Sequence, residues 1–206
     1  MYLIKTKILQ SPIEGKGYFA DENVPKGTIV YFYGEDDVRY SKEDLEKLNK
    51  KEKDRLLEDA VEDEFGIWVE TSTGLYTNHS CDPNIMPLFI GSQYTSIVVK
   101  DIESGDEITV DYSQFFSSTK WEMKCKCGTK QCRKTIGFGL KPDLELEKFW
   151  ESRINSALEC FPKVSQPIFQ SEDKYAIKIT RFLKSLNKPA LGKYVKFSLI
   201  DSDESS

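Results

Sequence analysis

Short apolar stretches separated by turn-forming residues run from the start of the chain to about Tyr112. Stretches of this length, bounded by glycine, proline, asparagine and aspartate, are typical of β strands joined by tight turns. They predict strands over residues 2–9, 28–33, 67–70, 85–90, 97–102 and 107–112. Because many short strands follow one another with little helix between them, the pattern predicts a mainly β fold of several small sheets.

Helical spacing interrupts this pattern once, over residues 41–64. Ser41 followed by Asp44 matches a capping box, which favours a helix start. The apolar residues behind it recur at helical intervals: Leu45, Leu48, Leu56, Leu57 and Val61. We therefore expect a short helical insert whose lysines and glutamates face solvent.

After Gly139 the apolar residues recur every three to four positions, which predicts two further helices. The first begins near Pro142 and Asp143, since both residue types favour a helix start. The second covers residues 174–186 and ends before Pro189. Residues 201–206 are polar and acidic, and we expect them to be disordered. The chain thus ends in a helical C-terminal extension.

Composition and charge narrow the classes of function. The 206 residues suit one domain with a small extension. No apolar stretch approaches the roughly 20 residues that cross a bilayer, and the start lacks the apolar core of a secretory signal. We therefore expect an intracellular protein, cytoplasmic or nuclear, with no membrane role and reduced cysteines. The net charge of −5 disfavours direct nucleic-acid binding and suits a basic, lysine-rich partner.

Three cysteines lie within eight residues, at Cys125, Cys127 and Cys132. This spacing lets three thiolates wrap one tetrahedral ion, and structural zinc usually takes four ligands. From the residues alone, the fourth ligand can be Cys81, Cys160 or the sole histidine, His79.

Two further segments concentrate polar side chains. Residues 78–84, NHSCDPN, contain the only histidine, a cysteine and two asparagines directly after an apolar stretch. Such density is costly to bury without partners, so we interpret the segment as a ligand-binding loop. Residues 105–112, GDEITVDY, form a turn and a strand that ends at Tyr112. Alone, this tyrosine is typical of an interior residue with a hydrogen-bonded hydroxyl.

Together these segments resemble the SET-domain family of protein-lysine methyltransferases, with its post-SET cysteine cluster. The matching segments occur in the family's order: GKGY at residues 15–18, YGE at 33–35, NHSCDPN at 78–84, EITVDY at 107–112 and CKCGTKQC at 125–132. The resemblance implies a SET-domain β fold with a knot-like threading that brings the NHSC segment beside the tyrosine strand. It also implies a SET domain over residues 1–116, a post-SET zinc segment over 117–140 and the helical extension over 141–206.

The resemblance implies residue roles as well. S-adenosylmethionine would be the methyl donor, with Lys16, Gly17 and Tyr18 at its amino-acid end. Asn78 and His79 would bind near its methionine and adenine parts. Tyr112 would contact the cofactor and act as the catalytic tyrosine.

The family's zinc site would consist of Cys81, Cys125, Cys127 and Cys132, which leaves Cys160 as a buried spare thiol. This structural zinc would tie the tail to the NHSC segment, so that Ile136 and Phe138 could close over the cofactor. The implied activity is methylation of lysine side chains on a histone or another protein.

The chain departs from the family pattern at a few positions. Leu75, Tyr76 and Thr77 replace the usual Arg-Phe before the Asn-His pair, Lys134 replaces a frequent glycine, and Val110 stands where an aromatic residue is common. Because the width of the lysine channel sets the number of methyl groups added, Val110 leaves that number open. An alternative function keeps the fold and the zinc but acts as a catalytically weak peptide-binding or scaffolding module.

Overall fold

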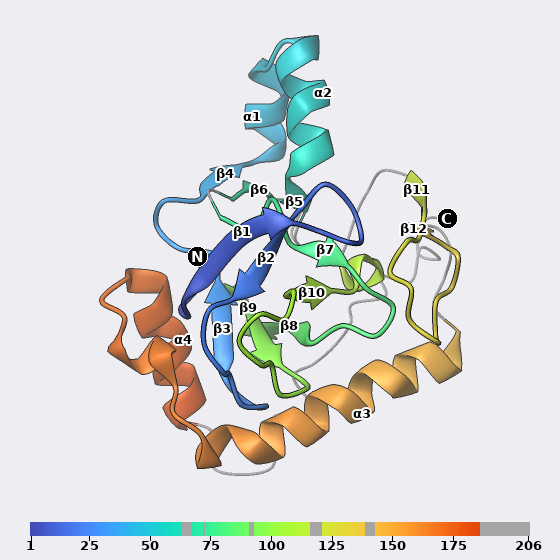
Figure 1. The fold of residues 1–206 in the computed structure, drawn as a ribbon. Coiled ribbons are helices and arrows are strands. Elements are labelled where there is room, and N and C mark those ends of the chain that lie inside the picture. The colour runs from blue at the N-terminus through green and yellow to red at the C-terminus, as the bar shows by residue number, and fades with distance from the viewer. Residues whose placement is uncertain (63–66, 72, 91–92, 116–120, 139–142, 186–206) are drawn as a thin grey trace.

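The computed structural model describes residues 1–62, 67–71, 73–90, 93–115, 121–138 and 143–185. Five small sheets carry the strands, which confirms the predicted mainly β fold (Figure 1). Four of the sheets are antiparallel, and the pair that joins the NHSC segment to the tyrosine strand is parallel. The sheets are β1 (Thr6–Gln10) with β2 (Lys16–Ala20); β3 (Ile29–Phe32), β9 (Gln93–Val98) and β8 (Ile85–Ile90); β4 (Val38–Tyr40), β6 (Trp68–Glu70) and β5 (Val61–Glu62); β7 (Asn78–His79) with β10 (Thr109–Val110); and β11 (Trp121–Lys124) with β12 (Thr135–Phe138).

The predicted strand boundaries agree best where apolar residues are continuous. Strand β8 spans the predicted residues 85–90, and β3 and β6 lie inside their predicted ranges. The strand predicted over 97–102 is wrong, because β9 starts earlier, at Gln93. Its polar residues Thr95 and Ser96 are fully buried between two neighbouring strands, with hydroxyls bonded to the Tyr31 carbonyl and the Tyr94 hydroxyl. Strand β2 lies outside all the predicted strands.

The insert contains two helices where one was predicted. Helix α1 (Lys42–Lys47) begins with the predicted capping box of Ser41 and Asp44. A second box, Asn49 with Glu52, starts α2 (Lys50–Asp59). The chain is extended between the boxes, so the helices form a hairpin that projects from the body (Figure 1). Val61 then enters strand β5, and residues 63–64 of the predicted helix lie outside the described residues.

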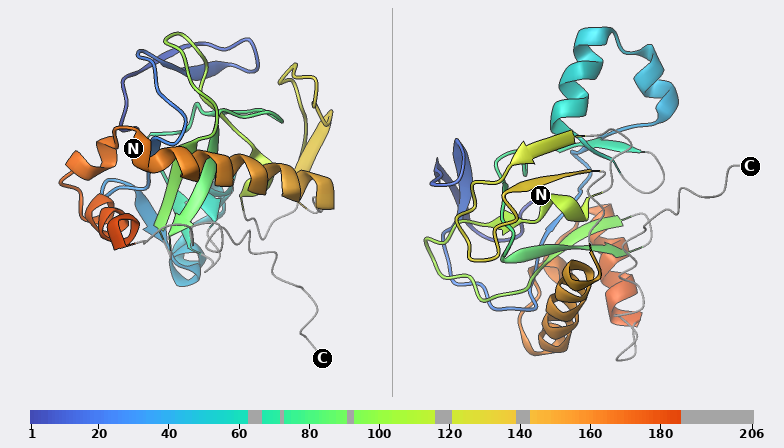
Figure 2. Two further views of the ribbon diagram at one scale, coloured as in Figure 1. Left: turned by 90° about the horizontal axis from the view of Figure 1, so that it is seen from below. Right: turned by 90° about the vertical axis from the view of Figure 1, so that its right-hand side faces the viewer.

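The C-terminal helices belong to the main hydrophobic core. Helix α3 (Leu144–Cys160) starts at the predicted cap Asp143, and α4 (Lys174–Ser185) follows after two short 3₁₀ turns, η2 (Phe161–Lys163) and η3 (Pro167–Gln170). Helix α3 runs along the body beside the β3-β9-β8 sheet (Figures 1 and 2). The buried side chains shared by helices and sheet include Ile29, Met86, Ile97, Trp150, Ile154, Ala157, Ile179 and Leu183. Each large side chain stabilises the fold by about 1.5–3 kcal/mol.

The predicted end of the second helix and the predicted acidic tail fall outside the description. Leu186, Pro189 and residues 201–206 are not among the described residues. No helix of the described part of the chain is long and apolar enough to cross a membrane.

Candidate functional site

The NHSC segment lies beside strand β10. The strand predicted to end at Tyr112 is shorter than expected, because β10 ends at Val110 and Tyr112 begins a 3₁₀ turn, η1 (Tyr112–Gln114). Parallel pairing of β7 with β10 places Asn78 opposite Thr109 and His79 opposite Val110. Asn84 fixes the same strand further along: its amide donates to the Glu107 carbonyl at 2.8 Å and accepts the Thr109 N–H at 2.9 Å. Asn84, which the sequence analysis placed in a ligand-binding loop, therefore bonds to the protein backbone.

The Asn78 side chain holds the loop before β2. Its amide lies 3.1 Å from the Glu14 carbonyl, 3.0 Å from the Lys16 carbonyl and 2.7 Å from a Glu107 carboxylate oxygen. A Cβ on Gly17 would come within 2.3 Å of that oxygen, so any side chain at this position would displace the Glu107 carboxylate from Asn78. The predicted cofactor residues Gly17 and Asn78 thus meet at one carboxylate.

Lys16 and Tyr76 present a cation and an aromatic face to solvent. Both side chains are exposed, and the Lys16 Nζ lies 5.7 Å from the Tyr76 ring centroid. Tyr18 connects them to the body, because its N–H donates to the Tyr76 carbonyl at 3.3 Å. Its hydroxyl accepts the Gly74 N–H, also at 3.3 Å. An exposed ammonium beside an aromatic ring suits a ligand that carries a carboxylate and a flat or cationic group.

The His79 ring joins Tyr112 to the cysteines. Its Nδ1 accepts the Tyr112 backbone N–H at 3.2 Å, and its Nε2 lies 3.3 Å from the Cys81 Sγ. Burial lowers the pKa of His79 to about 4, against the opposing effect of Asp111. The ring is therefore neutral near pH 7, with the proton on Nε2 directed at sulfur.

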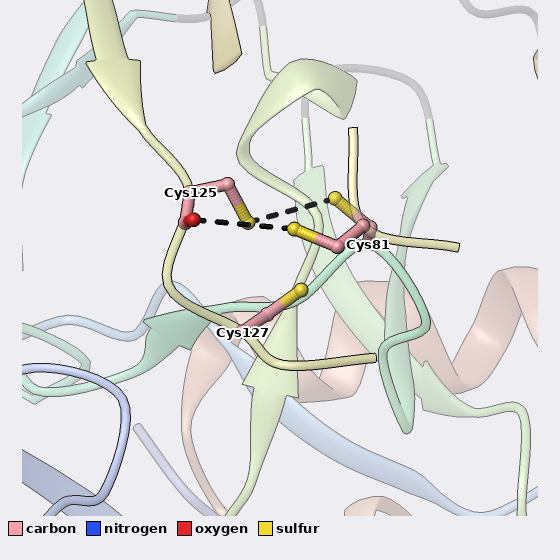
Figure 3. Close-up of side chains that lie close together, drawn as sticks. Cys81, Cys125 and Cys127 are labelled. Atoms are coloured by element: carbon pink, nitrogen blue, oxygen red, sulfur yellow. Dashed lines mark hydrogen bonds between the residues drawn. The ribbon is translucent and has the colours of Figure 1, made fainter. Parts of the chain in front are cut away.

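Cys81, Cys125, Cys127 and Cys132 form one cluster. Figure 3 shows the first three of these side chains close together. All four sulfurs lie within 4.8 Å of one another, and the Cys81 and Cys125 sulfurs are 3.7 Å apart. Four thiolates on zinc at about 2.3 Å would be separated by about 3.8 Å, so the cluster is consistent with a post-SET zinc site. His79 and Cys160, the other candidate ligands, are not in the cluster, and Cys160 is half-buried on α3.

A buried carboxylate links this cluster to the C-terminal helix. Arg133 donates its backbone N–H and its Nε–H to the Cys81 sulfur, each at 3.3 Å, and its guanidinium pairs with Asp111 at 2.5 Å. The Trp150 indole N–H of α3 donates to the same fully buried carboxylate at 3.1 Å. Sequence reasoning missed Asp111, Arg133 and Trp150 as a unit, although Asp111 lies inside a recognised segment and Arg133 directly follows another.

An aromatic cavity of about 500 Å³ lies on the other side of Tyr112. The Tyr112 hydroxyl donates to the Thr77 carbonyl at 2.8 Å, and burial, followed by the charge of Glu107, raises its pKa to about 12. Burial likewise raises the pKa of the other tyrosines in the wall, so all their hydroxyls stay protonated. The lining includes Tyr2, Tyr31, Tyr33, Glu62, Trp68, Thr77, Tyr94, Val110, Tyr112, Phe115, Trp121 and Met123.

Most of this lining was not predicted. Tyr33 belongs to a recognised segment, whereas Tyr2 and Tyr31 come from predicted strands that were given no role in the site, and Tyr94 lies outside the predicted strands. Lys16, Asn78 and His79 are not part of the lining, so Tyr112 is the predicted site residue that the cavity contains. Gln114, two residues after Tyr112, has a buried side-chain amide without a hydrogen-bond partner, but it is not part of the lining.

The chain was compared with protein-family models, curated proteins and solved structures. Residues 15–113 match the family model described as SET domain. Histone-lysine N-methyltransferase trr of Drosophila melanogaster is 27% identical over 139 residues, which are 62% of this chain and 6% of that protein. Human histone-lysine N-methyltransferase 2B is 28% identical over 136 residues, 63% of this chain and 5% of its own.

A third relative, the H3 lysine-36 specific histone-lysine N-methyltransferase of Candida albicans, is 27% identical over 150 residues, 69% of this chain and 18% of its own. The chain therefore spans less than a fifth of the length of these three relatives. A crystal structure from Plasmodium falciparum aligns with 53% of this chain and 93% of its own, at 22% identity and a TM-score of 0.40.

Proposed function

Because this chain belongs to the SET-domain lysine methyltransferase family, we propose that it is a protein-lysine N-methyltransferase that uses S-adenosylmethionine. The observation that carries the proposal is the position of Tyr112. Its backbone is tied through His79 to the cysteine cluster, and its hydroxyl lines a cavity walled by aromatic side chains. A peptide-binding module would not require a tyrosine whose backbone N–H is held by His79 and whose hydroxyl is held by the Thr77 carbonyl.

Residues on the two sides of Tyr112 would serve different ligands. Lys16, Gly17 and Tyr18 would hold the amino-acid end of the cofactor, with the exposed Lys16 ammonium facing its carboxylate. Asn78 and His79 would contribute backbone groups, because their side chains are already bonded within the protein. When bound, S-adenosylmethionine supplies a methyl group on a positively charged sulfur, which becomes a neutral thioether as the amine attacks.

The cavity would receive the substrate lysine and favour its reactive form. A free lysine amine has a pKa near 10.4, so only about one in a few thousand is neutral at pH 7. The apolar, aromatic wall penalises the charged ammonium and so lowers its pKa. Once neutral, the nitrogen carries the lone pair that forms the new N–C bond, and the displaced proton passes to solvent.

Tyr112 would orient the reaction. Its hydroxyl stays protonated, because burial raises its pKa to about 12, so it acts as a neutral dipole. The Thr77 carbonyl that accepts this hydroxyl fixes the direction of that dipole. A fixed dipole beside the transferring methyl stabilises the shift of charge without reorganisation.

The four cysteines would bind one structural zinc ion. Zinc prefers four thiolates in closed structural sites, and this cluster provides them from the NHSC segment and the tail. The ion would hold β11 and β12 near Tyr112, with Ile136 and Phe138 placed to cover the cofactor. Residues 1–116 and 117–140 would then act as SET and post-SET segments, and residues 141–206 as an extension whose helices complete the core.

The substrate would be a basic protein. The named relatives are histone-lysine methyltransferases, and the net charge of −5 favours a lysine-rich partner over nucleic acid. A histone tail or another lysine-bearing protein in the nucleus or cytoplasm meets this description.

The test is transfer of radiolabelled methyl groups from S-adenosylmethionine to histones and total cell protein. Labelling that maps to lysine and requires Tyr112, judged by Tyr112→Phe, is the expected result. Cofactor binding without labelling of any substrate would instead favour the binding-module alternative.

A further inference from the structure

The aromatic cavity is larger than one lysine side chain. A lysine side chain has five non-hydrogen atoms, which at about the 30 Å³ of a water molecule each occupy roughly 150 Å³. The cavity has about 500 Å³, within the range of pockets that take up a whole small molecule. Its wall reaches from Tyr112 to strand β5 of the insert and strand β11 of the tail, so it has room for a second substrate side chain.

The far wall combines an acid with two indole rings. Glu62 is 7% exposed on β5, and Trp68 lies directly across from it on β6. On β11, Trp121 and Met123 line the cavity, while the alternate residues Glu122 and Lys124 are exposed. Val61 and Glu62 of β5, which follows α2, line the same cavity as these β11 residues. The insert and the tail therefore face the same space.

Glu62 is the charged residue of the described lining, and the rest are neutral. At low effective dielectric a carboxylate attracts a cation strongly. A carboxylate beside the reactive amine would keep that amine protonated, which opposes methyl transfer. Glu62 is therefore better suited to a different cation of the substrate. A carboxylate offers about four lone-pair sites, so bonds that it already makes within the chain leave room for this one.

We propose that Glu62, flanked by Trp68 and Trp121, binds an arginine two residues from the target lysine of the substrate. The inference rests on the proposed function. Side chains two apart in an extended peptide point to the same side, so both enter one cavity. Arginine is favoured because its planar head binds a carboxylate through two hydrogen bonds and stacks on an indole face. The substrate class is thus Arg-X-Lys or Lys-X-Arg.

The test uses the full chain with zinc and S-adenosylhomocysteine, and peptides in which methionine replaces the target lysine, so that binding does not depend on turnover. For the wild type, replacing the arginine by alanine should weaken binding about tenfold. Glu62→Gln, which keeps the size of the side chain, should remove that difference. Trp121→Leu should reduce it, and both variants should keep the wild-type Tm. Glu70→Gln on the neighbouring strand β6, outside the cavity, is the matched control and should retain the full difference.

Methyl transfer to the corresponding lysine peptides separates the two claims. Transfer that occurs while binding is indifferent to arginine would overturn this inference alone. Arginine-dependent binding with no transfer to any peptide would contradict the proposed function alone. If Glu62→Gln shifted the pH–rate profile of every peptide equally, Glu62 would contact the target amine, and the assignment to a neighbouring arginine would be wrong.

Discussion

The polar cluster around Cys81 and the aromatic cavity meet at Tyr112, but they are built in different ways. In the cluster, each named side chain has a fixed partner: His79 bonds Tyr112 and Cys81, and Arg133 bonds Cys81 and Asp111. The cavity is an open space bounded by loops and by side chains from four of the five sheets, and five tyrosines contribute hydroxyls to its wall. The polar cluster is held by hydrogen bonds within the protein, whereas the aromatic cavity has space for a ligand.

This difference indicates which changes each region tolerates. Removing one member of such a cluster breaks several hydrogen bonds. The loss of stability is large because the former partners stay buried without a hydrogen bond. A cavity wall can change size or charge and still fold, so it is where substrate preference can vary. We therefore expect large, cooperative losses on the cluster side and selective changes on the cavity side.

Removing the metal should have the largest effect. Because the four thiolates join the tail to the NHSC segment, a chelator should loosen β11 and β12 and abolish methyl transfer. Cys81→Ser should lower zinc from about one ion per chain towards none, measured by atomic absorption. Cys160→Ser is the control on α3 and should retain both zinc and activity. A zinc content unchanged by Cys81→Ser would show that the ion uses another ligand.

Tyr112→Phe should have the next largest effect. It removes the hydroxyl bonded to the Thr77 carbonyl but keeps the backbone bond to His79. Turnover should fall by about a hundredfold, the loss typical of one oriented dipole at a reacting group. Calorimetry should give an unchanged affinity for S-adenosylmethionine, and thermal unfolding should shift by only a few degrees. Wild-type turnover would exclude a catalytic role for Tyr112.

Trp150→Phe should reduce stability and leave the cavity intact. It deletes the indole N–H that donates to Asp111, and hydrogen bonds to charged groups contribute about 1.5–3 kcal/mol. The free energy of unfolding measured in urea should fall by that amount or slightly more, because side-chain volume is also lost. Ile154→Val on the same buried face of α3 is the control, and it should cost about 0.5–1.5 kcal/mol of stability. Equal losses in both variants would show that the bond to Asp111 adds nothing.

The sequence predicted the cluster side much better than the cavity side, for a physical reason. The NHSC segment, the tyrosine strand and the cysteines are local in sequence, and their short spacing restricts how they can bind. Tyr31 and Tyr94 lie on the separate strands β3 and β9, and Tyr2 precedes β1 and bridges to Tyr31, so only the pairing of distant segments brings them to one wall. The same limit explains the misplaced start of β9. Its buried polar residues are satisfied by neighbours that the sequence does not reveal.

Val110→Phe should change the product more than the rate. Val110 is buried in the cavity wall two residues before Tyr112, so a larger ring would narrow the space for a methylated amine. Mass spectrometry of a methylated peptide should show fewer methyl groups per lysine than with the wild type. Overpacking should cost about 1–3 kcal/mol of stability, and Val110→Ile is the control for that cost. An unchanged product distribution would mean that another part of the wall sets the width.

Lys134→Gly should give the smallest effect, a gain in stability. Lys134 is exposed and has a φ of 67°, in the left-handed region that disfavours side chains, while its carbonyl accepts the Cys125 N–H at 2.7 Å. Glycine relieves that strain but increases the freedom of the unfolded chain, so we expect a net gain of about 0.5–1 kcal/mol in urea unfolding of the zinc-bound protein. Lys134→Ala removes the same side chain without relieving the strain and should give no gain. Equal changes in the two variants would trace the effect to the lysine side chain. A gain confined to glycine would show that the turn returning the chain from Cys132 to Cys125 itself requires the left-handed backbone.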